Sequence, residues 1–369
     1  MAELVFILTD FFLAAGADEP RTDAEGHSSS AVHASAGSSA GASDGTHAGL
    51  ARLPLLETLF ARARRETLQP DWRGWLTAQA AGGPSPASSA GLSMAQTVAA
   101  AWEWPQRPAQ SRGQVWLASP VHYFAGLDSI YLHRAGLLQL DDAEQHALVA
   151  DFERVFAGSA WSLRSIGRRE LLLSGPMIAA DGADPAQYVG CDPSAGMPHG
   201  VDAGALRGLG AEMEMWLYEH PLNLERRSRG DLPVTTLWLW GAQHNPRPPP
   251  ASGPQPQAPL PPLYGNDSYA EALWRLRGAE PHMLPARFEA LPGGARAGAI
   301  ILYSLLQPQG LGAALLQLEQ RWLAGAYRAL RHRHISVVRV LVGTRGYALQ
   351  WLDLGRLWRR RAPWWETLA

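Results

Sequence analysis

The chain has 369 residues, more than one ordinary compact core needs, so we expect two lobes or one large sheet with insertions. All 32 basic residues are arginines, and the absence of lysine excludes Schiff-base enzymes, P-loop nucleotide binders and protein kinases. The formal net charge of -2 argues against a globally basic nucleic-acid binder or a polybasic membrane-surface protein, and it leaves local patches open.

The single cysteine, Cys191, excludes an intramolecular disulfide and any metal site built from several cysteines. It stands in a turn-like setting with no adjacent histidine or arginine to lower its pKa, so we interpret it as an inert thiol. This cysteine usage fits a reducing compartment, and we expect a cytoplasmic location.

Residues 1–15 are predicted to supply the first strand of the core sheet. Leu4 to Leu8 form a short apolar run without alternation, which is typical of a strand buried on both faces of a parallel sheet. No positive charge precedes the run and Asp10 interrupts it, so it does not resemble a signal peptide. We expect no association with a membrane.

Residues 16–50 are a low-complexity stretch of small and polar residues that we expect to form a disordered linker. His27, His33 and His47 lie within it at spacings that match no compact metal site.

Residues 51–104 are predicted to be a helical segment. Helical patterning covers Leu53 to Leu68, continues weakly from Trp72 to Ala78, and recurs up to Trp102 after Ser93, a candidate N-cap. The stretch 81–91 between them is predicted to be a flexible connector.

Residues 105–180 are predicted to form an α+β subdomain with the order ββαββ. A helix capped by Asp141 or Asp142 and ending near Phe156 stands between two pairs of strands. The strands are expected at 115–117, 130–132, 161–163 and 171–173, the last two as a hairpin around Gly167.

Residues 181–244 are predicted to form a helix, a turn and a strand that returns to the core sheet. The helix is expected as one element from Gly210 to Arg229, with Gly230 closing it and a strand at Leu237 to Trp240. Residues 245–262 are proline-rich and are predicted to be a linker, either a simple spacer or a ligand for an SH3-like partner.

Residues 263–369 are predicted to complete the α/β core. The pattern favours strands at 263–264 and 299–303, helices at 268–276 and 311–330, and a terminal hairpin of 335–342 with 347–352.

The most specific motif runs from His220 to Arg227 and continues through Gly230, Leu232-Pro233 and the strand that ends at Gly241. It resembles the His-Pro-x-Asn-x-x-Arg run of archaeal-type cofactor-independent phosphoglycerate mutases in the alkaline phosphatase superfamily. A larger share of the chain resembles a bacterial family described as regulatory protein of the RpfE type. Its further matches are Ser119-Pro120-Val121-His122 with Asp128, Leu263-Tyr264-Gly265-Asn266-Asp267, and the arginine-rich segment after Leu352.

The resemblance implies an α/β fold with a mainly parallel central sheet of the alkaline-phosphatase type and an α+β insertion. It also suggests that Asn223, Arg226 and Arg227 hold a phosphate or carboxylate at the edge of the sheet. The alternative is structural: both arginines stand in the last turn of a helix, where cations favour the helix dipole, and Gly230 supplies a left-handed cap.

Mutase chemistry requires two divalent metals, a serine or threonine nucleophile, and Asp and His ligands. Asp10 stands where the first strand would deliver a ligand, but the Asp-Gly pair usual there is missing, and His332 and His334 lack a companion carboxylate. We therefore predict no metal or other cofactor and a non-catalytic regulatory or binding protein, with a small anionic ligand or an unknown protein partner. The alternative is a metal-dependent phosphoglycerate mutase or phosphatase whose ligands are not recognised.

The segment from Arg356 to Trp365 interleaves arginines with tryptophans. Such a mixture suits phosphate contacts with base stacking, or an anionic surface. It also suits a terminal helix whose tryptophans pack on the sheet while the arginines stay solvated. Because only four arginines are present and the surroundings are not basic, we do not expect nucleic-acid binding.

Overall fold

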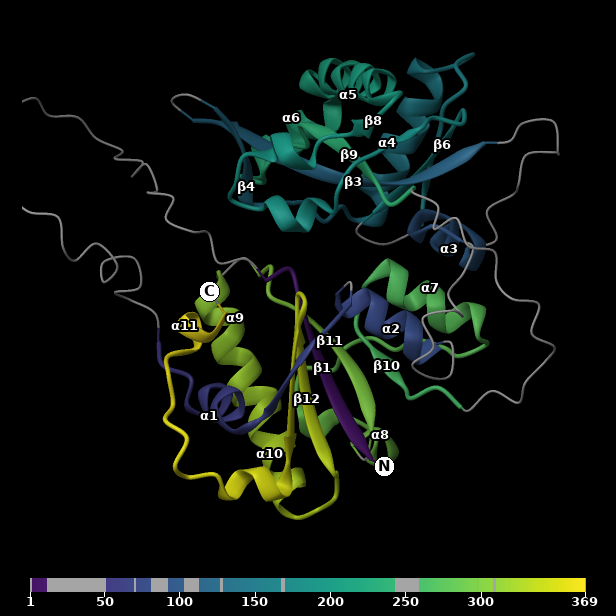
Figure 1. Cartoon of the computed structure of the whole chain (residues 1–369). Coiled ribbons are helices and arrows are strands. Elements are labelled where there is room, and N and C mark those ends of the chain that lie inside the picture. The colour runs from purple at the N-terminus through teal and green to yellow at the C-terminus, as the bar shows by residue number, and fades with distance from the viewer. Residues whose placement is uncertain are drawn as a thin grey trace, which may run out of the picture.

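The computed structural model describes residues 2–11, 51–69, 71–80, 92–102, 113–126, 129–166, 170–242, 259–296, 298–307 and 310–368. The segments predicted as linkers at 16–50 and 81–91, and most of the proline-rich run, lie outside these residues. The described chain forms two lobes, each on its own sheet (Figure 1). We name them the parallel lobe, which comprises the described residues up to 80 and from 259 onward, and the antiparallel lobe, residues 113–242.

The parallel lobe is built on a six-stranded sheet. Its strands lie in the order β10 (Leu263–Tyr264), β11 (Ala299–Ser304), β1 (Glu3–Thr9), β12 (Val337–Val342), β13 (Arg345–Gln350) and β2 (Arg64–Thr67). The first four are parallel to one another, and β13 and β2 are antiparallel to their neighbours. The predicted class, α/β with a mainly parallel central sheet, is confirmed.

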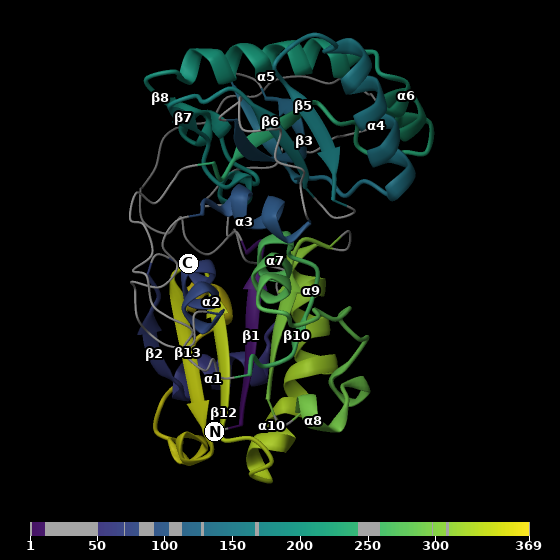
Figure 2. The same ribbon diagram turned by 90° about the vertical axis from the view of Figure 1, so that its right-hand side faces the viewer.

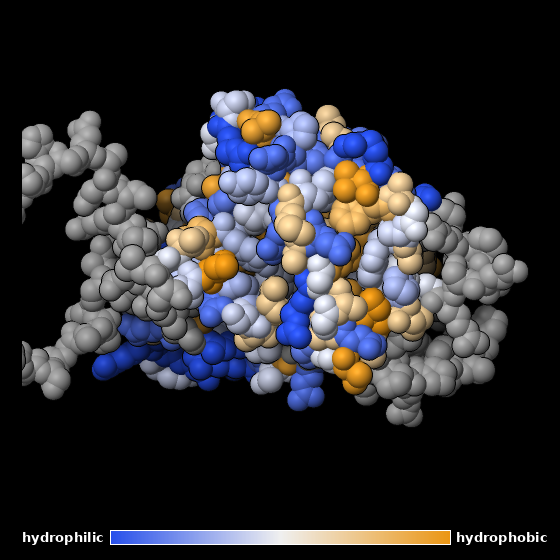
Figure 3. All heavy atoms as spheres, turned by 90° about the horizontal axis from the view of Figure 1, so that it is seen from above, coloured by the Kyte–Doolittle hydropathy of each residue, from blue (hydrophilic) through white to orange (hydrophobic). Residues whose placement is uncertain are grey.

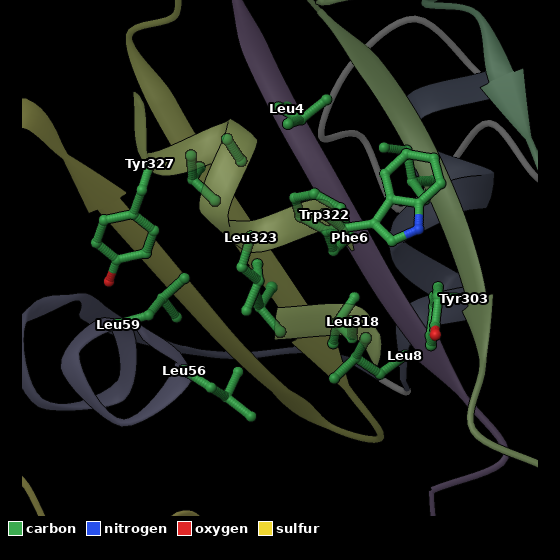
Figure 4. Packing of buried hydrophobic residues seen from close by; sticks show 14 of the residues in the cluster. Leu4, Phe6, Leu8, Leu56, Leu59, Tyr303, Leu318, Trp322, Leu323 and Tyr327 are labelled. Carbon is green, nitrogen blue, oxygen red and sulfur yellow. The ribbon is translucent and has the colours of Figure 1, made fainter. Parts of the chain in front are cut away.

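Strand β1 lies in the middle of this sheet and is buried on both faces. Leu4, Phe6 and Leu8 point towards Trp322 and Leu318 of the helical layer, as Figure 4 shows. Their neighbours in sequence, Val5 and Ile7, belong to the apolar cluster on the opposite face. This double burial explains why the run has no polar alternation.

Helices cover both faces of the parallel sheet. One face carries α1 (Pro54–Arg62), α9 (Leu311–Leu318), α10 (Ala324–Arg331) and α11 (Trp364–Leu368), and the other carries α2 (Trp72–Ala80) and α7 (Ser268–Leu276). The short helix α8 spans Gly293–Arg296. A π-helical turn at Glu319–Leu323 joins α9 to α10, so the helix predicted for 311–330 is continuous.

The Glu319 carboxylate accepts hydrogen bonds from the backbone N–H groups of Leu55 and Leu56, at 3.1 and 3.0 Å. The first turn of a helix has backbone N–H groups without partners in the helix, and the N-cap of α1, Leu53, has no side-chain acceptor for them. Glu319 supplies the missing acceptor.

The antiparallel lobe contains a five-stranded sheet with the order β4-β3-β6-β5 and with β9 beside β3. Its strands are β3 (Gln114–Ala125), β4 (Ile130–Leu137), β5 (Ser162–Ser165), β6 (Leu171–Gly175) and β9 (Thr236–Trp240). Helices α4 (Asp142–Val155), α5 (Ala203–Tyr218) and α6 (Pro221–Ser228) pack on one face. Two shorter strands, β7 (Ala180–Asp181) and β8 (His199–Gly200), pair with each other.

Two predicted helix starts are confirmed by complete capping boxes. Ser93 caps α3 (Met94–Ala101) together with Gln96, and Asp141 caps α4 together with Glu144. In each case the side chain of the cap and that of the residue three positions later satisfy each other's backbone N–H.

Three expectations about local structure were wrong. The helix predicted from Gly210 to Arg229 is two helices, because Pro221 has no N–H to donate and starts α6, with His220 as its N-cap. The helix predicted to reach Leu68 ends at Arg62, because the next residues pair with β13 as strand β2. Strand β9 does not return to the core sheet but pairs with β3, since a strand buried on both faces has the same pattern in either sheet.

The lobes meet along a seam made by α3, α7 and the second face of the antiparallel sheet. Ala95 and Val98 of α3 share an apolar cluster with Leu117, Trp238 and Ala272. In Figures 1 and 2, β1 runs upward towards this seam. The carboxyl ends of the parallel strands, where open α/β folds bind ligands, therefore face the antiparallel lobe.

Candidate functional site

Asn223, one of the three predicted ligand-binding residues, is 1% exposed in the antiparallel lobe. Its amide nitrogen donates to the carbonyl oxygens of Leu217 and Val234, both at 2.7 Å, and its amide oxygen accepts from the Val234 N–H at 2.7 Å. These bonds tie the end of α5 to the segment that leads into β9. The contacts give this side chain a structural role.

Arg226 is also buried, and its partners lie within the chain. Nη1 contacts both carboxylate oxygens of Glu144 at 2.9 Å, while Nε donates to the Leu232 carbonyl at 2.8 Å. Glu144 also accepts from Nη2 of Arg229 at 2.5 Å. Arg227, in contrast, is exposed. The anion-binding role of the three residues stays a prediction, and only Arg227 offers a guanidinium at the surface.

The carboxyl edge of the parallel sheet presents Asp10 directly after β1. Its backbone is left-handed, with φ 58°, a conformation that costs free energy for a residue with a side chain. One carboxylate oxygen accepts from Thr9 Oγ1 at 3.0 Å and from Ser304 Oγ at 2.7 Å. Because Thr9 and Ser304 are paired in register on β1 and β11, the sheet itself brings these groups together.

Arg73 of α2 lies at the seam and joins the lobes. Its guanidinium forms a hydrogen-bonded ion pair with Asp184 of the antiparallel lobe, and Nη2 lies 3.8 Å from Asp267, the N-cap of α7. The same guanidinium lies 4.4 Å from the ring centre of Trp72 and 5.4 Å from that of Trp240. One side chain thus contacts both lobes.

The electrostatics of Arg73 favour its charged form. Burial opposes the charge, but the carboxylates of Asp184 and Asp267 outweigh burial and raise the pKa of Arg73 above its ordinary value. Its Nε is buried without a hydrogen-bond partner, so the ion pairs and the two rings hold the group in place. A second contact across the seam joins Ser268 Oγ to Glu170.

The other sequence candidates are dispersed. Cys191 is exposed, and Asp128 lies outside the described residues, as do His27, His33 and His47. His332 and His334 are exposed in the turn that precedes β12, not on the strand. Within the described ranges, no three His, Cys, Asp or Glu side chains come together as a set of metal ligands.

Sequence reasoning missed Arg73. Its partner Asp184 is 111 residues away in the chain, and the Asp71-Trp72-Arg73 sequence at the start of α2 carries no recognisable motif. The role of Arg73 becomes visible only when the two lobes are seen packed together.

No protein-family model and no curated protein matches the chain. Among solved structures it is similar to a cofactor-independent phosphoglycerate mutase from Thermoplasma acidophilum, with 13% identity and a TM-score of 0.33 over 94% of this chain and 89% of that one. It is also similar to a protein from Pyrococcus horikoshii, with 11% identity and a TM-score of 0.39 over 95% and 87% of the two chains. No helix in the described residues is long and apolar enough to span a membrane.

Proposed function

We propose that this chain is a non-catalytic regulatory or binding protein on a phosphoglycerate-mutase-like scaffold of the alkaline-phosphatase type. One observation carries the proposal: polar groups at the carboxyl edge of the parallel sheet are bound to other parts of the chain. Asp10 accepts from Thr9 and Ser304, and Arg73 pairs with Asp184 and Asp267. These contacts hold strands and lobes together at the place where a phosphotransferase would present ligands and a nucleophile.

An activity assay tests the absence of catalysis. The purified protein, supplied in turn with Mg²⁺, Mn²⁺ and Zn²⁺, is expected not to interconvert 2- and 3-phosphoglycerate and not to release phosphate from either. Turnover that a chelator abolishes, and that Asp10→Asn also removes, would overturn the proposal.

The proposed ligand is a small phosphate or carboxylate bound at the end of α6. Arg227 supports this part of the proposal, because it is the exposed member of the three predicted residues and guanidinium groups recognise both anions. Inorganic phosphate is expected to raise the melting temperature of the protein, and Arg227→Ala is expected to remove the shift. Arg207→Ala, which changes an exposed arginine on α5, is the matched control.

The absence of any phosphate-induced shift in the intact protein would remove the ligand from the proposal. A shift that survives Arg227→Ala would assign the anion to another site. The buried Arg226 is unsuitable for this test, because its replacement unbalances Glu144.

The second candidate function is a metal-dependent phosphoglycerate mutase or phosphatase. The observation that favours it is Asp10, a left-handed residue at the carboxyl end of the central strand, because strained backbone often accompanies a functional side chain. This candidate predicts stoichiometric divalent metal in the purified protein and its loss in Asp10→Asn. Metal analysis of the two proteins distinguishes the two candidate functions.

A further inference from the structure

The segment Trp351–Arg361, the helix end at Arg331 and the turn at Arg333 form one surface, which we name the terminal patch. A 3-10 helix, Trp351–Gly355, follows β13 directly, and the Arg333 guanidinium lies 4.1 Å from the ring centre of Trp351. In Figure 1 the yellow segment after β13 begins at the lower edge of the parallel lobe and then runs up the side of this lobe to α11. The patch therefore lies on the parallel lobe, whereas α6 belongs to the antiparallel lobe.

Large apolar side chains of the terminal patch are open to solvent. Leu352, Leu357 and Trp358 are 64%, 74% and 75% exposed. Single exposed apolar residues are common on protein surfaces, but three within seven positions of one segment are a concentration that usually marks an interaction site.

The backbone beneath these side chains is firmly held. Asp353 is buried, accepts from the Gln350 N–H at 3.0 Å and pairs with Arg356 at 2.9 Å. Arg356 also donates to the Arg62 carbonyl at 2.9 Å, and buried Trp364 donates to the Ala51 carbonyl at 3.1 Å. The segment is thus anchored on both sides of Leu357 and Trp358, so these two side chains are presented outward by a fixed backbone.

The terminal patch carries an excess of positive charge. Trp351–Arg361 contains four arginines and one acidic residue, Asp353, which Arg356 already neutralises. Within the part of the chain that the structure describes, Arg331, Arg333, Arg360 and Arg361 form no ion pair with a carboxylate. A chain with a near-neutral net charge therefore carries a local excess of positive charge beside its exposed leucines and tryptophan.

We propose that the terminal patch binds an anionic lipid surface. Apolar side chains that enter the boundary between headgroups and acyl chains, flanked by arginines that meet the headgroup phosphates, are the pattern of interfacial membrane binding. Trp358 suits this boundary, because its indole combines an apolar body with a polar N–H. The expectation of no membrane association came from the net charge and from the opening segment of the chain, and neither reports a local patch.

A lipid surface fits the patch better than a nucleic acid. Base stacking requires open aromatic faces, but one face of Trp351 is already covered by Arg333. Leu352 and Leu357, two of the three strongly exposed apolar residues, provide no aromatic face for a base. Burial in an acyl layer uses all three side chains.

Co-sedimentation of the full chain with vesicles tests the proposal. Binding is expected with vesicles of phosphatidylcholine mixed with phosphatidylglycerol and not with phosphatidylcholine alone. Leu357→Ser with Trp358→Ser should weaken binding at least about tenfold by removing buried apolar area. Arg360→Gln with Arg361→Gln should weaken it about twenty-five-fold, roughly fivefold for each charge. Added salt should also weaken binding.

The antiparallel lobe provides matched controls. Met215 and Tyr218 on α5 are 71% and 76% exposed, close to the values for Leu357 and Trp358. Figure 3, which looks down on this lobe, shows apolar side chains interspersed with polar ones on its outer face. Met215→Ser with Tyr218→Ser, and Arg207→Gln with Arg134→Gln, which changes an exposed arginine on β4, are expected to leave vesicle binding unchanged.

Any of four other outcomes would overturn the proposal. Equal binding to neutral vesicles would show that charge plays no part, and equal loss in the control variants would place the contact elsewhere. Binding to a mixed-sequence single-stranded oligonucleotide without binding to vesicles would assign the patch to nucleic acid. Absence of binding to both probes would leave the patch with neither role.

Discussion

Arg226 is buried and Arg73 is largely buried, and both are paired with carboxylates, but they belong to different parts of the molecule. Arg226 lies within the antiparallel lobe and pairs with Glu144 of the same lobe. Arg73 lies on the parallel lobe and pairs with Asp184 across the seam as well as with Asp267 on its own side. The first pair stabilises one lobe, whereas the second also couples the two lobes. Similar chemistry therefore has a local effect in one case and an effect on the whole molecule in the other.

The difference also concerns their surroundings. Arg226 donates to one backbone carbonyl, that of Leu232, and to the carboxylate of Glu144 in the capping box of α4. Its replacement therefore disturbs the start of α4 and the end of α6 together. Arg73 is held by ion pairs and by the rings of Trp72 and Trp240. Its replacement is expected to loosen the seam while each lobe keeps its own core.

The largest expected effect is that of Arg226→Met. Methionine preserves much of the apolar stem but leaves the buried Glu144 carboxylate without Arg226, its buried partner, and loss of one member of a buried ion pair costs about 3–5 kcal/mol. Urea unfolding should show this decrease in the free energy of unfolding. Arg227→Met, one position along and exposed, should change it by less than about 0.5 kcal/mol.

A loss below about 1 kcal/mol for Arg226→Met would contradict the structural role of the pair, since that is the size expected of a surface ion pair. Equal losses in the two variants would show that the helix end, and not the contact with Glu144, matters.

A smaller loss, about 2–3 kcal/mol, is expected for Arg73→Met, because the side chain retains some access to solvent and its carboxylates can rehydrate when the seam opens. The distinctive result is a loss of cooperativity. Calorimetry should show two unfolding transitions in place of one, because the lobes have separate cores. Asp184→Asn should act in the same direction, and the double variant should lose less than the sum of the two single losses.

Unchanged cooperativity in Arg73→Met, or strict additivity with Asp184→Asn, would show that the apolar cluster of α3 and α7 holds the lobes together without the ion pair.

Several elements of the fold could be predicted from local pattern. The continuous apolar run of β1, the terminal hairpin of β12 and β13, and the capping residues Ser93 and Asp141 each have a cause within a few neighbouring positions. Local causes of this kind are visible in a single sequence.

The remaining features depend on contacts between distant segments. Strand β2 is almost entirely polar and exposed, and it exists because β13 offers an edge to pair with. The role of Arg73 depends on the approach of a second lobe. The predicted anion site fails for a different reason. The motif around Asn223 is visible in the sequence, but a motif does not reveal that the polar atoms of this side chain bind Leu217 and Val234.

The smallest expected effect concerns pH and His220, which separates α5 from α6. Burial lowers the pKa of His220, Arg154 lowers it further, and Asp151, whose Oδ2 lies 3.3 Å from Nε2, only partly offsets them. The Nδ1 atom accepts from the Leu222 N–H, so the folded protein holds the neutral ring. The unfolded chain binds a proton at a pH of about 6.5. The contribution of His220 is therefore complete above that pH and is lost as the pH falls towards the lower, folded value.

His220→Asn isolates this effect, because asparagine preserves an acceptor for the N-cap and does not titrate. Urea midpoints measured from about pH 7.5 to about pH 5 should fall less steeply for the variant than for the parent protein. Some slope should remain, since burial also lowers the pKa values of His122 and His133 in the same lobe. Arg73→Met should leave the slope unchanged, because Arg73 lies at the seam, apart from these histidines. If the two proteins show the same dependence of the urea midpoint on pH, the pKa of His220 is the same in the folded and unfolded states, and the prediction is wrong.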